Sequence, residues 1–230
     1  MLTSDGLGGQ PMSDVAKNNA KHVLMVSIAA AAWFALAVQL PLTIQTSTAH
    51  GMNILGAILT YLSFFTLLTN LLVALVLTFS LLATNARWGR FFSSPVVATG
   101  TALYIATVGA TYFLLLRHTW NPEGLVKLTD FLLHDFVPLG YVAYWIFFVP
   151  KSELRWKNTL SWTIYPVTYL AWILIRGDLY GRYPYPFVDV GSLGYPRTLL
   201  NSGILLMLFV LVSLAVVALA RRKRSRAAGR

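Results

Sequence analysis

Long apolar stretches separated by short polar segments run through almost the whole of this 230-residue chain. Crossing about 30 Å of hydrocarbon as a helix takes about 20 apolar residues. No stretch alternates apolar and polar positions as a barrel strand does, and helices are then the remaining way to satisfy backbone polar groups in lipid. We therefore predict six membrane-spanning helices, at approximately residues 23–44, 55–83, 95–116, 129–149, 160–175 and 199–220.

These six segments predict a single domain, an all-α integral membrane protein built as a six-transmembrane-helix bundle. The chain is 57% hydrophobic and 11% charged, a composition typical of integral membrane proteins. The span at 160–175 is the shortest and most polar of the six. The span at 55–83 is longer than a bilayer requires, so we expect it to tilt or to extend past the membrane.

The Lys and Arg residues are distributed unevenly between the two sides of the predicted bundle. With the N-terminus in the cytoplasm, 13 of the 18 basic residues fall on the inner side. The other five fall on the outer side and are Arg117, Lys127, Arg176, Arg182 and Arg197. This split follows the positive-inside rule and predicts that both termini are cytoplasmic. We therefore expect a multi-pass protein of the plasma membrane.

The two ends of the chain differ in composition from the spans. Residues 1–21 are polar and contain several Gly and Ser, so we predict a disordered cytoplasmic N-terminus ahead of a transmembrane domain at 22–220. No signal-peptide pattern precedes the first span, which we expect to be retained. The basic tail at 221–230, RRKRSRAAGR, is typical of a flank that contacts anionic lipid, and we favour this partner over nucleic acid.

The fourth predicted span contains a histidine and two aspartates in an otherwise apolar segment. An ionisable side chain at that depth costs roughly 2.5–3.5 kcal/mol, so a chain that keeps one usually uses it. Asp130 lies four residues before His134 and on the same helical face, whereas Asp135 is turned by about 100°. A carboxylate one turn away can hold an imidazole in one tautomer. The alternative is a His–Asp pair that only fastens helices together.

A row of polar side chains follows one face of the second predicted span. The row consists of Thr60, Ser63, Thr66 and Asn70, at spacings of three, three and four, with Thr69 beside it. Membrane hydroxyls often bond the carbonyl four residues earlier, so packing is the alternative to a functional role. Asn70 stands out because its amide needs several partners in hydrocarbon.

The fifth predicted span ends at Arg176, near the outer rim. Before it runs a stripe of aromatic side chains that packing or an interfacial belt explains, namely Tyr165, Tyr169 and Trp172. The loop at 177–197 is rich in Tyr, Pro and Gly, and we expect it to cap the outer mouth of the bundle. At about 1.5 Å per residue, four side chains are expected to meet in the outer half: Thr66, Asn70, His134 and Arg176.

A hydroxyl, an imidazole and a carboxylate are the parts of nucleophilic acyl transfer. Imidazole titrates near neutral pH, so it can take the hydroxyl proton, and a side-chain amide such as that of Asn70 can stabilise an oxyanion. A site among lipid-facing helices favours a lipid-like ester. The sequence contains no HExxH, no Gly-rich phosphate loop and no cysteine, and its four histidines lie on separate elements. We therefore expect no metal or cofactor.

Three short motifs bear a resemblance to a known group of proteins. They are YLSFFTLLTN in the second span, LLHDFVPL in the fourth and YPYPFVDV in the outer loop. With the six-span layout, they resemble the bacterial six-helix membrane proteins of the Pr6Pr family and, more distantly, the androgen-induced / FAR-17a-like family of membrane threonine hydrolases. The resemblance implies hydrolysis of fatty acid esters of hydroxy fatty acids, with Thr66 as nucleophile and His134 as its partner.

The eukaryotic pattern differs in the spacing between the threonine and the asparagine. That pattern has two residues between them, whereas three residues separate Thr66 from Asn70 here. Thr69 is therefore an alternative nucleophile, although a spacing of four keeps Thr66 and Asn70 on one face. Two other kinds of function stay open. One is a non-catalytic membrane protein that binds lipid or a partner, and the other is a small transporter that relays protons through its buried His, Asp and Arg.

Overall fold

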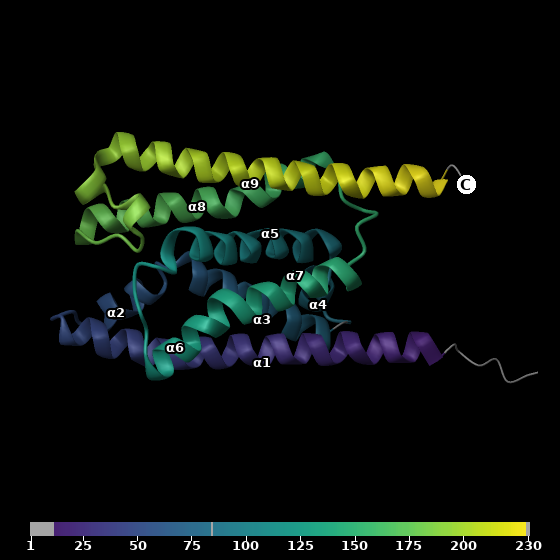
Figure 1. Ribbon diagram of the computed structural model, residues 1–230, viewed down its shortest axis with the longest axis horizontal. Helices are drawn as coiled ribbons and strands as arrows, with labels where there is room; N and C mark the ends of the chain where they lie inside the picture. The colour runs from purple at the N-terminus through teal and green to yellow at the C-terminus, as the bar shows by residue number, and fades with distance from the viewer. Residues whose placement is uncertain (1–11, 84, 229–230) are drawn as a thin grey trace, which may run out of the picture.

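The computed structural model describes residues 12–83 and 85–228, and this part of the chain is helical without a strand (Figure 1). The elements are α1 (Met12–Ala49), α2 (Ile54–Tyr61), α3 (Phe65–Leu82), α4 (Arg87–Phe92), α5 (Pro95–Thr111), η1 (Tyr112–Leu116), α6 (Gly124–Phe131), η2 (Leu132–Phe136), α7 (Val137–Phe148), α8 (Trp156–Tyr180), η3 (Pro186–Val188) and α9 (Val190–Ala228). Two of the short segments, η1 and η2, are π-helical, and η3 is a 3₁₀ turn. The predicted all-α fold is confirmed.

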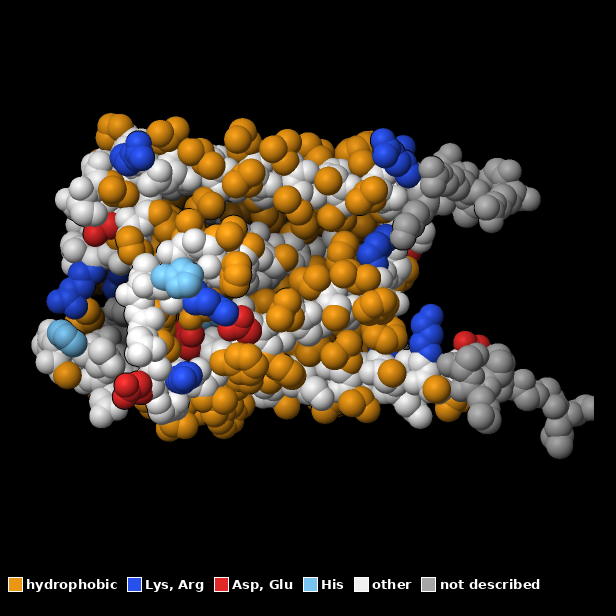
Figure 2. Space-filling view, viewed as in Figure 1, with side chains coloured by type: hydrophobic (Ala, Val, Ile, Leu, Met, Phe, Trp, Pro, Cys, Tyr) orange, Lys and Arg blue, Asp and Glu red, His pale blue; other side chains and the backbone are white. Residues whose placement is uncertain are grey.

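Five helical stretches of the described residues are long and apolar enough to cross a membrane. They are Asp14–Ala49, Phe65–Leu82, Pro95–Leu116, Gly124–Phe148 and Val190–Arg222. The helix that contains the predicted fifth span, α8, is long enough with 25 residues but is more polar than these five. Apolar side chains cover the middle of the face in Figure 2, with most Lys and Arg toward the two ends. The chain is therefore a membrane-embedded helical protein.

Both ends of the described chain lie at the same end of the bundle. The start of α1 and the end of α9 are together at the right of Figure 1, and the link between α7 and α8 lies there too. Residues 12–21, which we expected to be disordered, belong to α1, and residues 221–228 of the basic tail continue α9. Residues 1–11 and 229–230 lie outside the described residues. We call the opposite end, where α2 and α6 lie, the loop end.

The second predicted span is two helices rather than one. A turn at residues 62–64 separates α2 from α3 close to the loop end, so the prediction of a continuous helix at 55–83 is wrong. The turn leaves two carbonyls to be satisfied by α8. Tyr169 OH donates to the carbonyl of Ser63 at 2.8 Å, and Trp172 Nε1 donates to that of Leu62 at 3.2 Å. Irregular backbone can persist at membrane depth only where other parts of the protein supply such partners.

Two groups of buried side chains hold the helices together. The larger one joins α1, α3, α5 and α7, which form a four-helix body around Ile28, Val73, Ile105, Val137 and Tyr141, all of them fully buried. The smaller one joins the α8–α9 hairpin to α5. Trp162 Nε1 donates to the carbonyl of Val96 at 2.9 Å, and a Cβ on Gly100 would lie only 2.6 Å from the Trp162 ring. The glycine therefore lets α8 approach α5 closely.

Candidate functional site

A π-helical turn places His134. In η2 the N–H of Val137 bonds the carbonyl of Leu132, one residue further back than in an α-helix. Pro138 follows and has no N–H, so the carbonyl of Leu133 loses its helical donor. The side chain of Asn70 on α3 replaces it, with Nδ2 donating to Leu133 O at 3.1 Å. The irregular turn is thus tied directly to the helix that contains Thr66.

One ring nitrogen of His134 is held and the other is free. Nδ1 forms a hydrogen bond with the backbone carbonyl of Asp130 at 3.0 Å. The Asp130 carboxylate oxygen Oδ1 is equally close, at 3.0 Å, but the alignment is not that of a hydrogen bond. The carbonyl therefore fixes the Nδ1–H tautomer, and the carboxylate lies beside the same nitrogen. No hydrogen bond within residues 12–83 and 85–228 engages Nε2.

Tyr112 completes the surroundings of His134. Its ring stacks on the imidazole with 4.0 Å between centroids and 13° between planes, and its hydroxyl donates to the carboxylate of Asp130. Tyr112 begins the other π-helical turn, η1, where the N–H of Arg117 bonds the carbonyl of Tyr112 at 2.8 Å. Nothing in the spacing of Tyr112 marks it as a partner of His134, so sequence reasoning missed it.

Asp135 points away from this group, as its position on the helix predicts. Its carboxylate pairs with Arg117, whose guanidinium lies 5.3 Å from the ring centres of both Tyr112 and Phe113. The pair is partly exposed, with 35% of the Arg117 side chain and 27% of the Asp135 side chain accessible. Asp130 is therefore the carboxylate next to His134, and Asp135 instead joins η2 to the end of η1.

Thr66 lies in the first turn of α3, next to a tyrosine from the loop after α8. The hydroxyl of Tyr185 accepts the N–H of Thr66 at 3.3 Å and lies 3.5 Å from Thr66 Oγ1. Tyr185 itself stacks on Phe187, with 5.2 Å between ring centroids. Burial raises the pKa of the Tyr185 hydroxyl, so it stays protonated at neutral pH. The loop after α8 therefore covers Thr66, and Tyr185 is a site residue that the spacing of motifs did not single out.

The structure separates the two threonine candidates. Thr69 is fully buried, its hydroxyl lies 3.1 Å from that of Tyr165, and it lines no cavity described below. Asn70 does not offer a free oxyanion donor, because its amide donates to the carbonyls of both Thr66, at 2.9 Å, and Leu133. That hypothesis for Asn70 is therefore wrong, and the residue instead joins the helix of Thr66 to that of His134.

Arg176 lies apart from His134. Its side chain is 4% exposed and donates to Thr60 Oγ1 at 2.7 Å and to the carbonyl of Arg182 at 3.0 Å. The expected meeting of Arg176 with Thr66 and His134 therefore does not occur. Arg176 instead contacts Thr60 on α2 and the loop after α8, and it lines neither cavity described below.

Thr66 and His134 line one cavity of about 470 Å³ at the loop end, which we call the His134 cavity. Its wall comes from α1, α2, α3, η1, α6, η2 and the loop after α8. The polar part of the lining is Gln39, Thr43, Thr46, Ser47, Thr60, Thr66, Tyr112, Thr119, Asp130, His134 and Tyr185. The structure thus brings the predicted hydroxyl, imidazole and carboxylate to a shared space.

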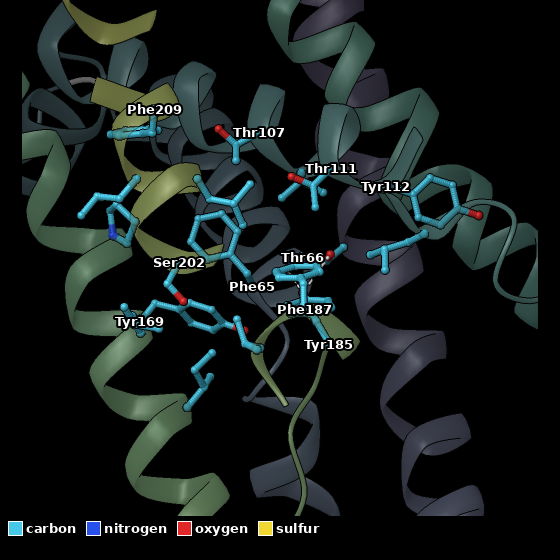
Figure 3. Close-up of a pocket in the computed structure, with 18 of the residues that line it drawn as sticks. Phe65, Thr66, Thr107, Thr111, Tyr112, Tyr169, Tyr185, Phe187, Ser202 and Phe209 are labelled. Atoms are coloured by element: carbon cyan, nitrogen blue, oxygen red, sulfur yellow. Dashed lines mark hydrogen bonds between the residues drawn. The ribbon is translucent and has the colours of Figure 1, made fainter. Parts of the chain in front are cut away.

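A second cavity of about 120 Å³ lies between the four-helix body and the α8–α9 hairpin, and we call it the Phe209 cavity (Figure 3). Its wall is mostly apolar and includes Phe65, Val108, Ile173, Leu206 and Phe209. The two cavities share four lining residues, namely Thr66, Tyr112, Leu116 and Tyr185. Thr66 therefore stands where the two spaces meet.

The site combines a hydroxyl at a helix N-terminus, an imidazole with one free nitrogen and two phenols. No protein-family model matches the chain, and no curated protein or solved structure is significantly similar to it. Among the described residues, no group of three or more His, Asp or Glu side chains is placed to hold a metal ion. The chemistry of the site therefore has to be inferred from its own geometry.

Proposed function

We propose that the protein is a membrane-embedded hydrolase of lipid esters, of the fatty acid ester of hydroxy fatty acid type, with Thr66 as nucleophile and His134 as base. One observation is the main support for this proposal. Thr66 and His134 line the same cavity, and the carbonyl of Asp130 holds Nδ1 of His134 while Nε2 is free. A base positioned in this way can remove a proton from a hydroxyl.

The reaction divides into two acyl transfers. In the first, Nε2 takes the proton of Thr66 Oγ1, the oxygen attacks the ester carbonyl, and the alcohol leaves with that proton. In the second, Nε2 takes a proton from water, the hydroxide attacks the acyl-threonine, and the acid leaves as Thr66 regains its proton. Each attack requires the nucleophile about 2.6–3.2 Å from Nε2, so Thr66 Oγ1 has to turn from Tyr185 toward His134 when substrate binds.

Two groups beside Thr66 can stabilise the oxyanion that forms in each attack. The first turn of a helix carries partial positive charge, and Thr66 lies in that turn of α3, where the N–H groups of Thr66, Leu67 and Leu68 already have acceptors. The protonated hydroxyl of Tyr185 already contacts both the N–H and the Oγ1 of Thr66. Removing one such donor in other enzymes slows turnover by about 10²–10³-fold.

We also propose how the protein crosses the membrane and on which side its termini lie. The α8 helix starts at the end where α7 finishes and stops at the end where α9 begins, which supports a sixth crossing by α8. We place both termini in the cytoplasm of a plasma-membrane protein, with the basic tail against anionic lipid. The substrate then enters from the lipid. The resemblance of the three motifs to the androgen-induced / FAR-17a-like family supports this activity.

The test is turnover of a lipid ester by purified protein. His134→Ala should reduce kcat by about 10³-fold or more while the protein stays folded, because it removes the base but leaves the cavity. His118→Ala is the matched control, since His118 is exposed at the same end and lines neither cavity. Undiminished turnover in His134→Ala would refute the role of His134.

Chemical labelling identifies the nucleophile. A fluorophosphonate probe should attach to Thr66, and mass spectrometry of the labelled peptide separates Thr66 from Thr69. Label on Thr69 would overturn the assignment of the nucleophile but leave the hydrolase proposal intact. Absence of both label and turnover would favour the second candidate, a lipid-binding protein without chemistry. The contact of Thr66 Oγ1 with Tyr185 rather than with His134 is the observation that favours this candidate.

A further inference from the structure

The Phe209 cavity has a wall that offers few polar groups. The hydroxyl of Thr107 donates to the carbonyl of Leu103 at 2.8 Å, and that of Ser202 donates to the carbonyl of Thr198 at 2.8 Å. Both bonds run to the residue's own helix, so these hydroxyls have no donor left for a ligand. An apolar cavity of this kind stays dry and favours an apolar occupant.

Phe209 marks one end of this cavity, and Thr66 and Tyr185 mark the other. Figure 3 shows Thr66, Tyr185 and Phe187 together there, with Phe209 at the far side of the cavity. The wall runs along α9 from Ser202 to Phe209, seven residues apart, which corresponds to about 10 Å of helix. Phe209 closes the deep end by stacking on Tyr104, with 5.6 Å between ring centroids and 13° between planes. The cavity therefore extends between Thr66 and Phe209, with a mostly apolar wall and the contact of Thr66 with Tyr185 at one end.

We infer that the Phe209 cavity binds the unbranched acyl chain of the ester, with the carbonyl carbon at Thr66 and the alcohol side in the His134 cavity. This assignment rests on the proposed hydrolase function. Thr66 lines both cavities, and His134 lines only one of them, so the two sides of a bound ester meet different surroundings. The leaving alcohol needs a proton from His134, which places it on that side, and the acyl group takes the apolar side.

The assignment predicts what each cavity holds between the two reaction steps. After the ester C–O bond breaks, the acyl chain remains bonded to Thr66 Oγ1 inside the Phe209 cavity. The alcohol, protonated by His134, leaves through the His134 cavity, and water enters by the same space to attack the acyl-threonine. Selectivity for the acyl chain should therefore depend on the walls between Thr66 and Phe209, and not on the residues around His134.

A pair of leucines on α9 tests this with matched substitutions. Leu206 lines the Phe209 cavity, whereas Leu208 is 51% exposed on the same helix. Leu206→Trp should lower kcat/KM for p-nitrophenyl octanoate by at least about tenfold relative to the butyrate ester, because the indole fills the chain site. Leu208→Trp should leave the ratio between the two esters unchanged. A second variant, Phe209→Ala, should shift the preference toward longer chains by opening the deep end.

A binding measurement separates this inference from the hydrolase proposal. A photoreactive diazirine analogue of octanoic acid, added to His134→Ala protein, should label peptides that line the Phe209 cavity. Leu206→Trp should block this labelling, and Leu208→Trp should retain it. Labelling there without turnover by wild-type protein would refute the hydrolase and keep the chain site. The opposite result is also possible. If Leu206→Trp and Phe209→Ala both turn over the two esters with an unchanged ratio of kcat/KM, and the probe labels peptides elsewhere, the chain site is refuted and the hydrolase proposal stands.

Discussion

Regular helix is interrupted twice beside the candidate site, at η2 and at the turn before α3. Different parts of the protein supply the hydrogen-bond donors for the carbonyls that each interruption leaves unpaired. At η2 the carbonyl of Leu133 is bonded by the amide of Asn70, which is fully buried between α3 and η2. At the turn before α3, Tyr169 and Trp172 bond the carbonyls of Ser63 and Leu62. The donor at η2 belongs to the four-helix body, and the donors at the turn before α3 belong to the α8–α9 hairpin.

The comparison shows how the site is held in place. The interruption at η2 sets the position of His134. The interruption before α3 sets where the helix that contains Thr66 begins. Both depend on side chains from distant parts of the sequence, because lipid supplies no hydrogen-bond partners. Asn70 has no access to water, whereas the hydrogen bond of Trp172 is exposed. Removing the hydrogen bonds of Asn70 should therefore reduce stability more than removing that of Trp172.

The largest effect is expected from Asn70→Leu. This substitution leaves the carbonyls of Thr66 and Leu133 without side-chain partners in a dry interior, and an unsatisfied buried group costs about 1–3 kcal/mol. We expect a loss of about 2–3 kcal/mol in the free energy of unfolding, measured by denaturant titration in detergent. The control is Asn53→Leu, which removes an exposed helix cap and should cost only about 1 kcal/mol. An equal loss in both variants would mean that the buried hydrogen bonds of Asn70 contribute no more to stability than an exposed helix cap.

A smaller effect is expected from Tyr169→Phe. The ring and its packing on Phe65, at 4.9 Å between centroids, are kept, and only the hydrogen bond to the carbonyl of Ser63 is lost. We expect a loss of about 1–2 kcal/mol in the free energy of unfolding and a reduced kcat, since the start of α3 becomes less fixed. Tyr195→Phe, at a tyrosine that is 47% exposed, is the control. Unchanged stability in Tyr169→Phe would mean that α8 does not support the turn through this bond.

The smallest effect is expected from Trp172→Phe. Its hydrogen bond to the carbonyl of Leu62 is exposed, so water can replace the indole N–H. We expect a loss of about 0.5–1 kcal/mol in the free energy of unfolding, with kcat nearly unchanged. A thermal melt of the three variants side by side gives their order directly. A larger loss for Trp172→Phe than for Asn70→Leu would reverse the comparison.

Relationships within one helix were predictable from the sequence. Asp130 lies next to His134, and Asp135 faces elsewhere toward Arg117, because a helix places residues four apart on one face and adjacent residues about 100° apart. Pro138 removes a backbone donor, but in a regular α-helix the carbonyl that loses it would be that of His134. Only the π-helical turn seen in the structure makes it the carbonyl of Leu133.

Relationships between helices were not predictable in this way. Tyr185 covers Thr66 and Tyr112 stacks on His134 although each pair is far apart in the sequence. The break before α3 likewise depends on distant residues, Tyr169 and Trp172 on α8. Arg176 was expected beside His134 from depth alone, but depth does not determine the direction in which a side chain points.

The sequence by itself determined that this is an all-α membrane protein and which ionisable groups share a helical face, because hydrophobic length and helical periodicity are local properties. Tertiary structure alone decided that Thr66 and His134 line one cavity, that Asn70 joins their helices, and that Thr66 also opens on an apolar space. The reason is physical. In a medium without water, each interrupted carbonyl needs a partner from another helix, and the partner that packing supplies sets the final geometry.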